Sequence, residues 1–534
     1  MSPAADLVVV SAHIRTLDTA RPFASAVAIR DGVITAVGQD GDAHELRGPK
    51  TEVVDGRGMA IVPGLTDAHQ HPFMGALDTR GADLAGAATV DEVRSRLAAE
   101  RRRCGDGAWV TAHSLEYRVF DELRASGELF VEAVEGAPAF LTFFDYHTAI
   151  ATPAALAAAG IDGPRRFDDA SEIVCDDAGR PTGELREGAI GLIEAVRPAI
   201  STEQRLQVVA TALAAMNRTG LTAVHMMDGT PETPALCAEL EARGLLTVRQ
   251  VVPFTAEPTM SDEEIEAAIA AGPQAGALWR SGWAKLFIDG VVETGTAWLE
   301  SPDTHGRGTE PNWPDPERYA EVIRRFAAAG WPSITHAIGD RAVRCALDAY
   351  RAAGAVARGP HRVEHIETAQ DDQIGRFAAE GVVASQQAIH LQWMTADMTD
   401  PWSRSLGRDR ARRGFRLGDL RRSGAVLALG SDWPVAGYDP RDGMAWARLR
   451  RRPGDHEAES YLPGQRLDAL EALEGYTTEA ARAVNEAGVA GRIAPGMRAD
   501  LTAFADDPVD CDADDLPDVP ALMTVVGGRI VHRM

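Results

Sequence analysis

The sequence predicts a (β/α)8 TIM barrel that carries a small β-sandwich domain formed from both chain ends and an inserted α/β subdomain after the first barrel strand. Three observations predict this fold class. Short β-type segments occur at both ends of the chain, strand and helix patterns alternate between them, and one connection is far too long for a simple crossover. The chain of 534 residues has room for such a barrel with additions.

Both ends of the chain have the pattern of short antiparallel strands. Apolar and polar residues alternate there in four segments, residues 6–14, 26–37, 500–504 and 524–532. Hairpin turns are predicted at Asp31-Gly32 and at Gly527-Gly528. Because exposed strand edges need partners, we expect the two ends to pair into one β-domain, made of residues 1–62 and 488–534.

The predicted barrel domain covers residues 63–487. It contains eight strand candidates, at residues 65–71, 221–227, 245–252, 283–289, 333–338, 362–367, 382–387 and 426–432. Helical patterns separate most of them, for example residues 317–329 and 342–353, which end near glycines. The long interval after the first strand, about residues 75–198, predicts the inserted subdomain.

Composition indicates a protein that acts on a small molecule. Lys and Arg total 54 against 79 Asp and Glu, and the formal net charge of -25 repels nucleic acid phosphates and anionic membrane surfaces. The five cysteines are scattered without a CxxC pair, which favours reduced thiols. The sequence shows neither a signal peptide nor a membrane-spanning run, so we expect a cytoplasmic protein that binds neither nucleic acid nor membrane.

Six residues of metal-ligand type follow or end the strand candidates. His69 and His71 are two residues apart in a strand, so both imidazoles share one face and can hold one metal ion. On its own, a His-x-His pair is explained equally well as two partly exposed histidines that bind no metal. Four further residues of this type lie at or near the carboxyl ends of other strand candidates: Lys285, His336, His365 and Asp432. Because the carboxyl ends of barrel strands meet at one rim, we expect all six side chains to converge there.

Lys285 needs a separate explanation, since an ammonium group cannot bind a metal and usually pairs with a carboxylate, here Asp289. Several motifs, however, resemble those of the amidohydrolase superfamily, more narrowly its YtcJ-like branch (amidohydrolase family 3), which includes N-substituted formamide deformylases. They are PGLTDAHQHP, HTAIATPAAL, GRPTGELRE, KLFIDGVVETGTAWL, ITHAIGDRAV, RVEHIET, LALGSDWPV, PGMRADLTAF and TVVGGRIV. Together they span nearly the whole chain.

The resemblance implies a binuclear centre with two divalent metal ions, for which zinc is the expected metal. Lys285 would be carboxylated and bridge the two ions. The inner ion would be held by His69, His71, Lys285 and Asp432, and the second by Lys285, His336 and His365. The implied reaction is hydrolysis of an amide-type carbon-nitrogen bond, in an N-substituted formamide or an N-acyl compound, by metal-activated hydroxide. Lys285 and Asp432 would be the catalytic residues, with Asp432 as the proton shuttle.

Three residues are predicted to bind the substrate. His147 resembles a family position that reaches into the pocket, His390 is a candidate to contact the scissile carbonyl, and Trp433 is a candidate for the pocket wall. Each has an equally simple structural explanation, in backbone hydrogen bonding or core packing. The run VVETGTAWL and the pair Gln387-Ala388 depart from the branch pattern near the expected pocket, so the substrate of a relative does not transfer directly.

Other interpretations stay open at this point. Asp340, Arg341 and Glu364 lie next to ligand candidates and either orient imidazoles or form surface ion pairs. A mononuclear deaminase uses a similar barrel but usually has a glutamate shortly after the fifth-strand histidine, whereas His336 is followed by Ala-Ile-Gly-Asp. A non-catalytic protein that keeps only the fold is a third interpretation. The presence of ligand-type residues at all six positions argues against it. Related proteins are often dimers, so a homodimer is one oligomeric state to be considered.

Overall fold

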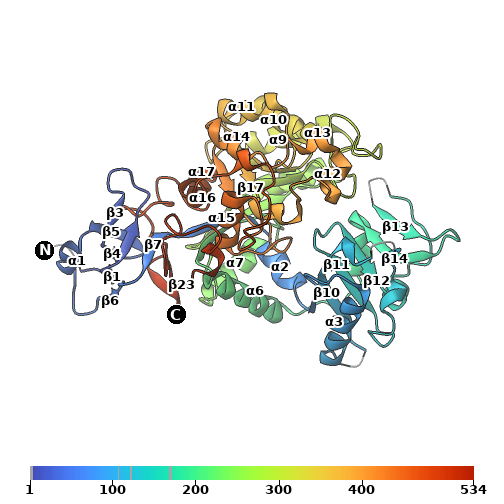
Figure 1. The fold of residues 1–534 in the computed structure, drawn as a ribbon, viewed down its shortest axis with the longest axis horizontal. Coiled ribbons are helices and arrows are strands. Elements are labelled where there is room, and N and C mark those ends of the chain that lie inside the picture. The colour runs from blue at the N-terminus through green and yellow to red at the C-terminus, as the bar shows by residue number, and fades with distance from the viewer. Residues whose placement is uncertain (1–3, 106, 121–122, 168–170) are drawn as a thin grey trace. The chain divides into compact units, whose positions relative to one another are not determined.

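The computed structural model describes residues 4–105, 107–120, 123–167 and 171–534. The chain forms two compact units, each coloured by residue number in Figure 1. The first unit comprises Met1–Pro72, Ala210–Trp433 and Gly437–Met534, and the second comprises Phe73–Val209 and Pro434–Ala436. Among the described residues, no helix combines the length and the apolar character needed to cross a membrane.

Eight parallel strands form the central sheet of the first unit, and their spatial order follows the chain. They are β8 (Leu65–Gln70), β15 (Leu221–Met226), β16 (Arg249–Thr255), β17 (Trp279–Phe287), β18 (Ser333–Ala337), β19 (Arg362–His365), β20 (Val383–Gln386) and β21 (Leu427–Leu429). The backbone N–H of Asp432 donates to the His69 carbonyl (2.7 Å), and that of His71 donates to the Trp433 carbonyl (2.8 Å). These bonds join the first strand to the segment after the last one, so the sheet nearly closes, and the predicted barrel is confirmed.

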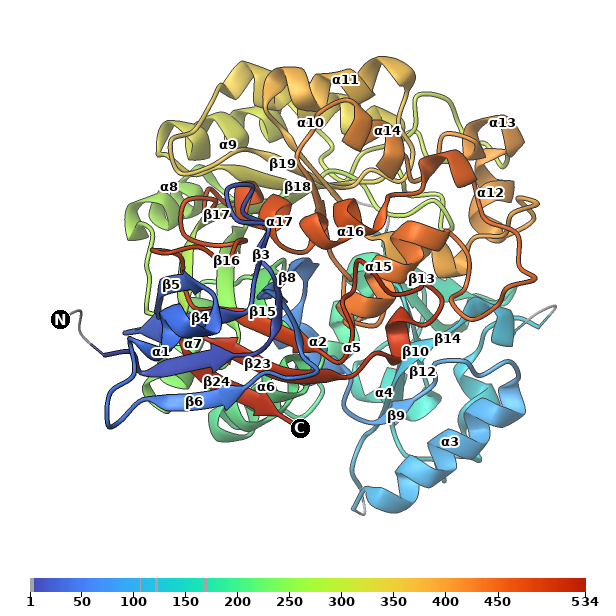
Figure 2. The same ribbon diagram turned by 60° about the vertical axis from the view of Figure 1, so that its left-hand side comes forward.

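Helices lie outside the barrel strands, and Figure 2 shows α9, α10 and α11 side by side along β18 and β19. The helices between strands include α7 (Thr233–Ala242), α8 (Asp262–Ala271), α9 (Pro316–Ala328), α10 (Asp340–Ala353), α11 (Asp371–Glu380) and α14 (Leu417–Arg422). Further helices after β21 include α15 (Pro440–Leu449), α16 (Ala469–Gly475) and α17 (Thr478–Ala483). Helix α10 is amphipathic and buries Val343, Leu347 and Tyr350 toward the sheet. The strands predicted at residues 245–252 and 283–289 are shifted, to Arg249–Thr255 and Trp279–Phe287.

Two further sheets contain the ends of the chain. One has the order β5-β4-β1-β6, from β1 (Leu7–Val10), β4 (Ala26–Arg30), β5 (Val33–Gly38) and β6 (Glu52–Asp55). The other has the order β24-β23-β22-β7-β2-β3, from β2 (His13–Arg15), β3 (Phe23–Ala24), β7 (Ala60–Pro63), β22 (Leu501–Phe504), β23 (Ala521–Val526) and β24 (Arg529–Arg533). Asp31 and Gly32 have φ values of 52° and 74°, as a tight hairpin turn requires. Because β22 pairs with β7, the two chain ends share one sheet.

The second unit contains a mixed six-stranded sheet of its own. Its order is β13-β14-β12-β11-β10-β9, with β9 (Ala82–Asp83), β10 (Val110–Leu115), β11 (Ala139–Phe143), β12 (Thr148–Ala151), β13 (Glu172–Cys175) and β14 (Pro181–Arg186). Helix α3 (Val90–Arg103) buries Val93 and Leu97 in the same apolar core as Leu141. This unit is the α/β subdomain that the long interval after β8 predicts.

His361, just before β19, makes the stability of the barrel sensitive to pH. Its Nδ1 accepts from the Ser333 backbone N–H (3.0 Å), its Nε2 contacts the Gly354 carbonyl (3.2 Å), and its ring stacks on Tyr350. Burial lowers the pKa of His361 to about 4, so the folded protein keeps the ring neutral. The stabilising contribution is present above the ordinary pKa of about 6.5 and is lost as the pH falls through about 4.

We therefore expect the free energy of unfolding to fall by about 2 kcal/mol between pH 7 and pH 5 through His361 alone. Asparagine can accept the Ser333 hydrogen bond but does not titrate, so His361→Asn should remove this part of the pH dependence. Urea unfolding of both proteins at several pH values measures the difference, and groups common to both cancel. Parallel pH profiles for the two proteins would contradict the assignment.

Candidate metal centre

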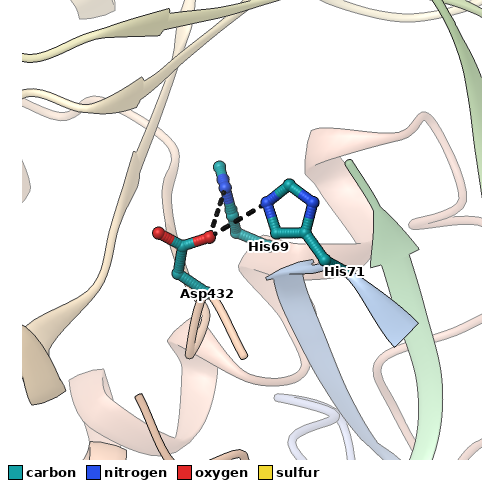
Figure 3. A group of neighbouring side chains, drawn as sticks. All are labelled: His69, His71 and Asp432. Atoms are coloured by element: carbon teal, nitrogen blue, oxygen red, sulfur yellow. Dashed lines mark ion pairs between the residues drawn. The ribbon is translucent and has the colours of Figure 1, made fainter. Parts of the chain in front are cut away.

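His69, His71 and Asp432 meet at the carboxyl end of the barrel strands (Figure 3). Nε2 of His69 lies 3.2 Å and Nε2 of His71 lies 3.1 Å from the same oxygen, Oδ1 of Asp432. All three side chains are nearly or fully buried. Burial opposes ionisation of Asp432, but His69 and His71 outweigh it and hold the pKa of that carboxyl well below its ordinary value. The carboxylate is therefore negative, as a metal ligand or a proton acceptor must be.

The backbone at Asp432 is held in an uncommon conformation. Asp432 has φ 62°, in the left-handed region that non-glycine residues avoid. Gly430, two residues earlier, packs so closely that a Cβ there would lie 2.5 Å from the His69 backbone nitrogen. Asp67 fixes the same segment, because it accepts hydrogen bonds from both Oγ and the backbone N–H of Ser431. The segment just after β21 therefore packs closely against β8, which brings Asp432 to the two histidines.

A second group of imidazoles lies beside the first. The ring centroid of His365 is 4.6 Å from that of His69 and 4.4 Å from that of His336. Asp432 Oδ2 lies 4.0 Å from His365 Nδ1 and 3.9 Å from His390 Nε2. His336 Nε2 faces the Gly290 carbonyl at 3.2 Å, so the neutral ring carries its lone pair on Nδ1. All of these residues except Gly290 are among the site candidates named from the sequence.

Lys285 is fully buried on β17. Its Nζ lies 4.5 Å from the centre of the Phe287 ring and, among the described residues, has no hydrogen-bond partner. Burial lowers the pKa of Lys285 to about 8, although Glu364 and Asp432 act in the opposite direction. The alternative partner Asp289 instead accepts three backbone N–H groups, from Trp298, Ile338 and Gly339. Lys285 is thus a buried amine with a lowered pKa and is not half of an ion pair with Asp289.

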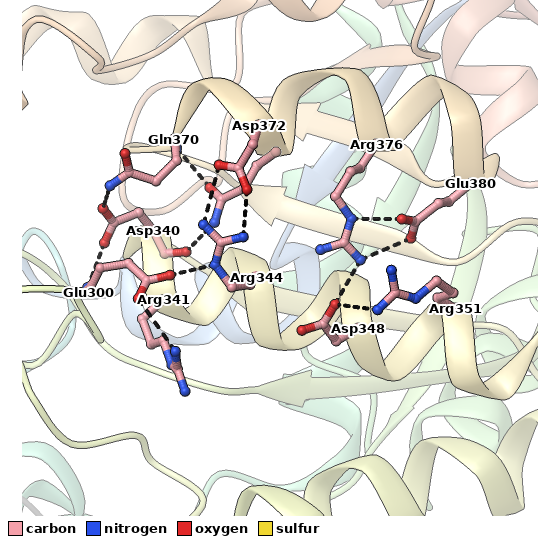
Figure 4. Close-up of polar contacts among 11 residues, drawn as sticks. Glu300, Asp340, Arg341, Arg344, Asp348, Arg351, Gln370, Asp372, Arg376 and Glu380 are labelled. Carbon is pink, nitrogen blue, oxygen red and sulfur yellow. Dashed lines mark hydrogen bonds and ion pairs between the residues drawn. The ribbon is translucent and has the colours of Figure 1, made fainter.

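Glu364 and Asp340 show how two carboxylates next to ligand candidates differ. Glu364 Oε2 lies 2.6 Å from His69 Nδ1, so it orients that imidazole. Asp340 accepts from the Glu300 backbone N–H and from the Gln370 side chain instead. Figure 4 shows Asp340 and Arg341 in a network of charged residues on α10 and α11. Of the residues expected to orient imidazoles, Glu364 does so, whereas Asp340 and Arg341 take part in ion pairs and hydrogen bonds among helices. Asp340, the carboxylate that follows His336 in the sequence, is therefore engaged with Glu300 and Gln370.

The donor set fits a divalent metal. With its Nδ1 proton donated to Glu364, His69 leaves Nε2 facing an oxygen of Asp432 at 3.2 Å. Either a proton on Nε2 or a metal cation between the two atoms offsets the repulsion of their lone pairs. Within the described residues, His365 Nδ1, His390 Nε2 and Lys285 Nζ are also buried without hydrogen-bond partners. Imidazole nitrogens and a carboxylate are the ligands that zinc accepts in proteins.

The three residues predicted to bind substrate have different surroundings. His390, on the 3-10 helix Ala388–Trp393, is beside Asp432, and its Nδ1 lies 3.9 Å from Glu367. Trp433 contacts Tyr438 edge to face at a centroid distance of 5.4 Å. His147 belongs to the second unit, where its Nδ1 contacts Glu187 at 2.9 Å. Contacts with a substrate stay a prediction for all three.

A nearly closed barrel of parallel strands with a buried cluster of histidines and an aspartate at its carboxyl end defines the class of TIM-barrel metal-dependent hydrolases. More narrowly, the chain belongs to the amidohydrolase family, whose pattern matches residues 52–532.

Relatives of nearly the same length are known. The chain is 28% identical to the protein LONG AFTER FAR-RED 3 of Arabidopsis thaliana, covering 99% of this chain and 92% of that protein. It is 27% identical to the protein YtcJ of Bacillus subtilis (95% and 96% covered) and 26% identical to the N-substituted formamide deformylase of Arthrobacter pascens (99% and 98% covered). The resemblance to the YtcJ-like branch is confirmed by these two matches.

A crystal structure of an uncharacterized metal-dependent hydrolase from Pyrococcus horikoshii is similar in fold. It superimposes with a TM-score of 0.76 at 23% sequence identity, over 95% of this chain and 99% of that one. The likeness supports the same barrel architecture for this chain.

Proposed function

We propose that this protein hydrolyses an amide-type carbon-nitrogen bond of a small molecule, with N-substituted formamides and N-acyl compounds as the first candidates. One observation carries the proposal: His69 and His71 both direct Nε2 at one oxygen of Asp432, while His69 Nδ1 is already bonded to Glu364. A divalent cation placed between these atoms would be held by all three side chains. Family membership and the similarity to a formamide deformylase favour amide hydrolysis as the reaction.

The residues are proposed to divide between two divalent ions, with zinc as the expected metal. His69, His71 and Asp432 would hold one ion, and His336 and His365 the other. Lys285, once carboxylated, would supply an oxygen to each. When bound, the ions lower the pKa of a water molecule and polarise the scissile carbonyl.

Asp432 is proposed to move the proton. Its carboxylate is ionised, buried and surrounded by four imidazoles, so it can accept the proton of the attacking water. The same proton would pass from Asp432 to the leaving nitrogen, whose departure requires protonation. His390, whose Nε2 lies 3.9 Å from Asp432 Oδ2, is proposed to hydrogen-bond the substrate carbonyl oxygen.

The test combines metal analysis with a substrate panel. The purified protein, loaded with zinc and desalted, is expected to hold about two ions per chain. It is then assayed against N-substituted formamides, N-acyl amines, N-acyl amino acids, cyclic imides and, as the competing reaction, amino-substituted heterocycles. Release of an amine with a carboxylic acid supports the proposal. Ammonia release from the heterocycles alone with about one ion per chain would overturn it in favour of a deaminase.

A further inference from the structure

One arginine in the barrel interior makes hydrogen bonds to residues on four strands. Arg362, on β19, is fully buried. It donates to Glu364 through Nε (2.9 Å) and Nη2 (3.1 Å), and Nη2 also donates to the Ala68 carbonyl (2.7 Å). Further bonds run to Ser385 Oγ (3.3 Å) and to His225 Nδ1 (2.9 Å). These partners lie on β8, β15, β19 and β20, so a single guanidinium fixes the relative positions of four strands.

The contacts of this arginine lead to His69 by two routes. Glu364 Oε2 is shared between Arg362 Nη2 and His69 Nδ1, so the guanidinium sets the direction of the carboxylate that receives the imidazole proton. Arg362 also holds the carbonyl of Ala68, the residue directly before His69. Both the ring and the main chain of His69 are therefore attached to the same side chain.

Stability alone is a poor explanation for this ion pair. Arg362 and Glu364 are both fully buried, and the cost of removing two charges from water offsets most of their attraction. Apolar side chains of similar volume often fill such positions without loss of stability. Arg450, another fully buried arginine, makes a useful contrast, because it donates to the carbonyls of Tyr461 and Phe415, which lie outside the metal centre.

We propose that Arg362 is a positioning residue of the metal centre. It fixes the Glu364 carboxylate and the Ala68 carbonyl so that His69 keeps its proton on Nδ1 and offers Nε2 to the metal in one orientation. This inference rests on the proposed function, since it takes His69 as a metal ligand. Groups that orient ligating histidines typically change metal affinity by 10- to 100-fold when removed.

Arg362→Lys and Arg450→Lys form a matched pair for the test. Each keeps a buried positive charge and loses the planar fork of donors, so both are expected to lower the thermal unfolding midpoint. The zinc dissociation constant, measured by competition with a chelator, should rise about 10- to 100-fold in Arg362→Lys and stay unchanged in Arg450→Lys. The visible absorption of the cobalt(II)-substituted protein should change in the first variant only, because it reports ligand geometry.

A double variant covers the case in which the lysine does not fold. Arg362→Met combined with Glu364→Leu replaces the ion pair by apolar side chains, which leaves no unpaired buried charge, and it should fold but bind zinc as weakly as Arg362→Lys is expected to. Wild-type zinc affinity in Arg362→Lys or in the double variant, or an equal loss in Arg450→Lys, would overturn the inference. A wild-type protein that binds no zinc would overturn the proposed function instead.

Discussion

Asp432→Asn is expected to lower kcat by about 1,000- to 10,000-fold, because asparagine keeps the shape of the side chain but cannot accept the proton of the attacking water. Metal should remain bound, since His69, His71, His336 and His365 are untouched. The direct measurements are kcat on the substrate found in the panel and metal content by mass spectrometry of the same sample. Unchanged turnover would remove Asp432 from its role as proton shuttle.

The choice of asparagine matters because of the backbone. Asp432 has φ 62°, a conformation that asparagine and aspartate tolerate better than alanine, so Asp432→Ala adds strain to the loss of the carboxylate. Asp31→Asn is the matched control. Asp31 has φ 52° in the exposed β4–β5 hairpin, far along the chain from the barrel strands. Equal losses of activity in the two asparagine variants would point to a general folding defect rather than to proton transfer.

The barrel and its ligand set are predictable because one physical rule connects them. Parallel strands bring their carboxyl ends to a common rim, so ligand-type residues at or near the ends of several strand candidates predict a cluster without knowledge of any loop. His69 and Asp432 are more than 360 residues apart, yet their atoms lie 3.2 Å from each other. Strand limits are less predictable, as β16 and β17 show; at β16 the apolar residues within 245–248 end before the first residue of the hydrogen-bonded strand, Arg249.

The interior network around Arg362 could not be predicted in the same way. The sequence Arg-Val-Glu-His places Arg362 and Glu364 on one face of β19, but their partners Ala68, His225 and Ser385 depend on the stagger of neighbouring strands. His225, on the second barrel strand, is one such partner, since its Nδ1 is bonded to Arg362. Substrate contacts are harder still, since loop residues follow no periodic pattern.

One signal in the composition does single out Lys285. The chain has 54 basic residues, of which only two are lysines, Lys50 and Lys285. Lys50 is exposed, whereas Lys285 is fully buried. Where arginine serves almost every other cationic role, a buried lysine indicates chemistry that a guanidinium cannot perform. A neutral amine can react with carbon dioxide, whereas arginine keeps its proton at any physiological pH.

Lys285→Met is expected to reduce metal content from about two ions to about one per chain and to lower kcat/KM by about 1,000-fold or more, since one ion contributes several kcal/mol of transition-state stabilisation. In the proposed centre, Lys285 would supply the bridge between the ions only after its amine has lost a proton and added carbon dioxide. A pKa of about 8, set by burial, leaves an appreciable neutral fraction near neutral pH, which makes this addition feasible. Metal analysis and steady-state kinetics on protein prepared with bicarbonate measure both effects.

The scarcity of lysine makes the carbamate itself directly testable. In Lys50→Arg the only lysine left is Lys285, so protein incubated with zinc and ¹³C-labelled bicarbonate should show one lysine carbamate signal by NMR and full activity. In Lys285→Met, with Lys50 intact, that signal should vanish together with the second metal ion. Reconstitution of the metal-free protein should also be slower in buffer stripped of carbon dioxide. A fully active Lys50→Arg protein without a carbamate signal would show that Lys285 acts as a plain amine, and the bridged two-metal centre would have to be abandoned.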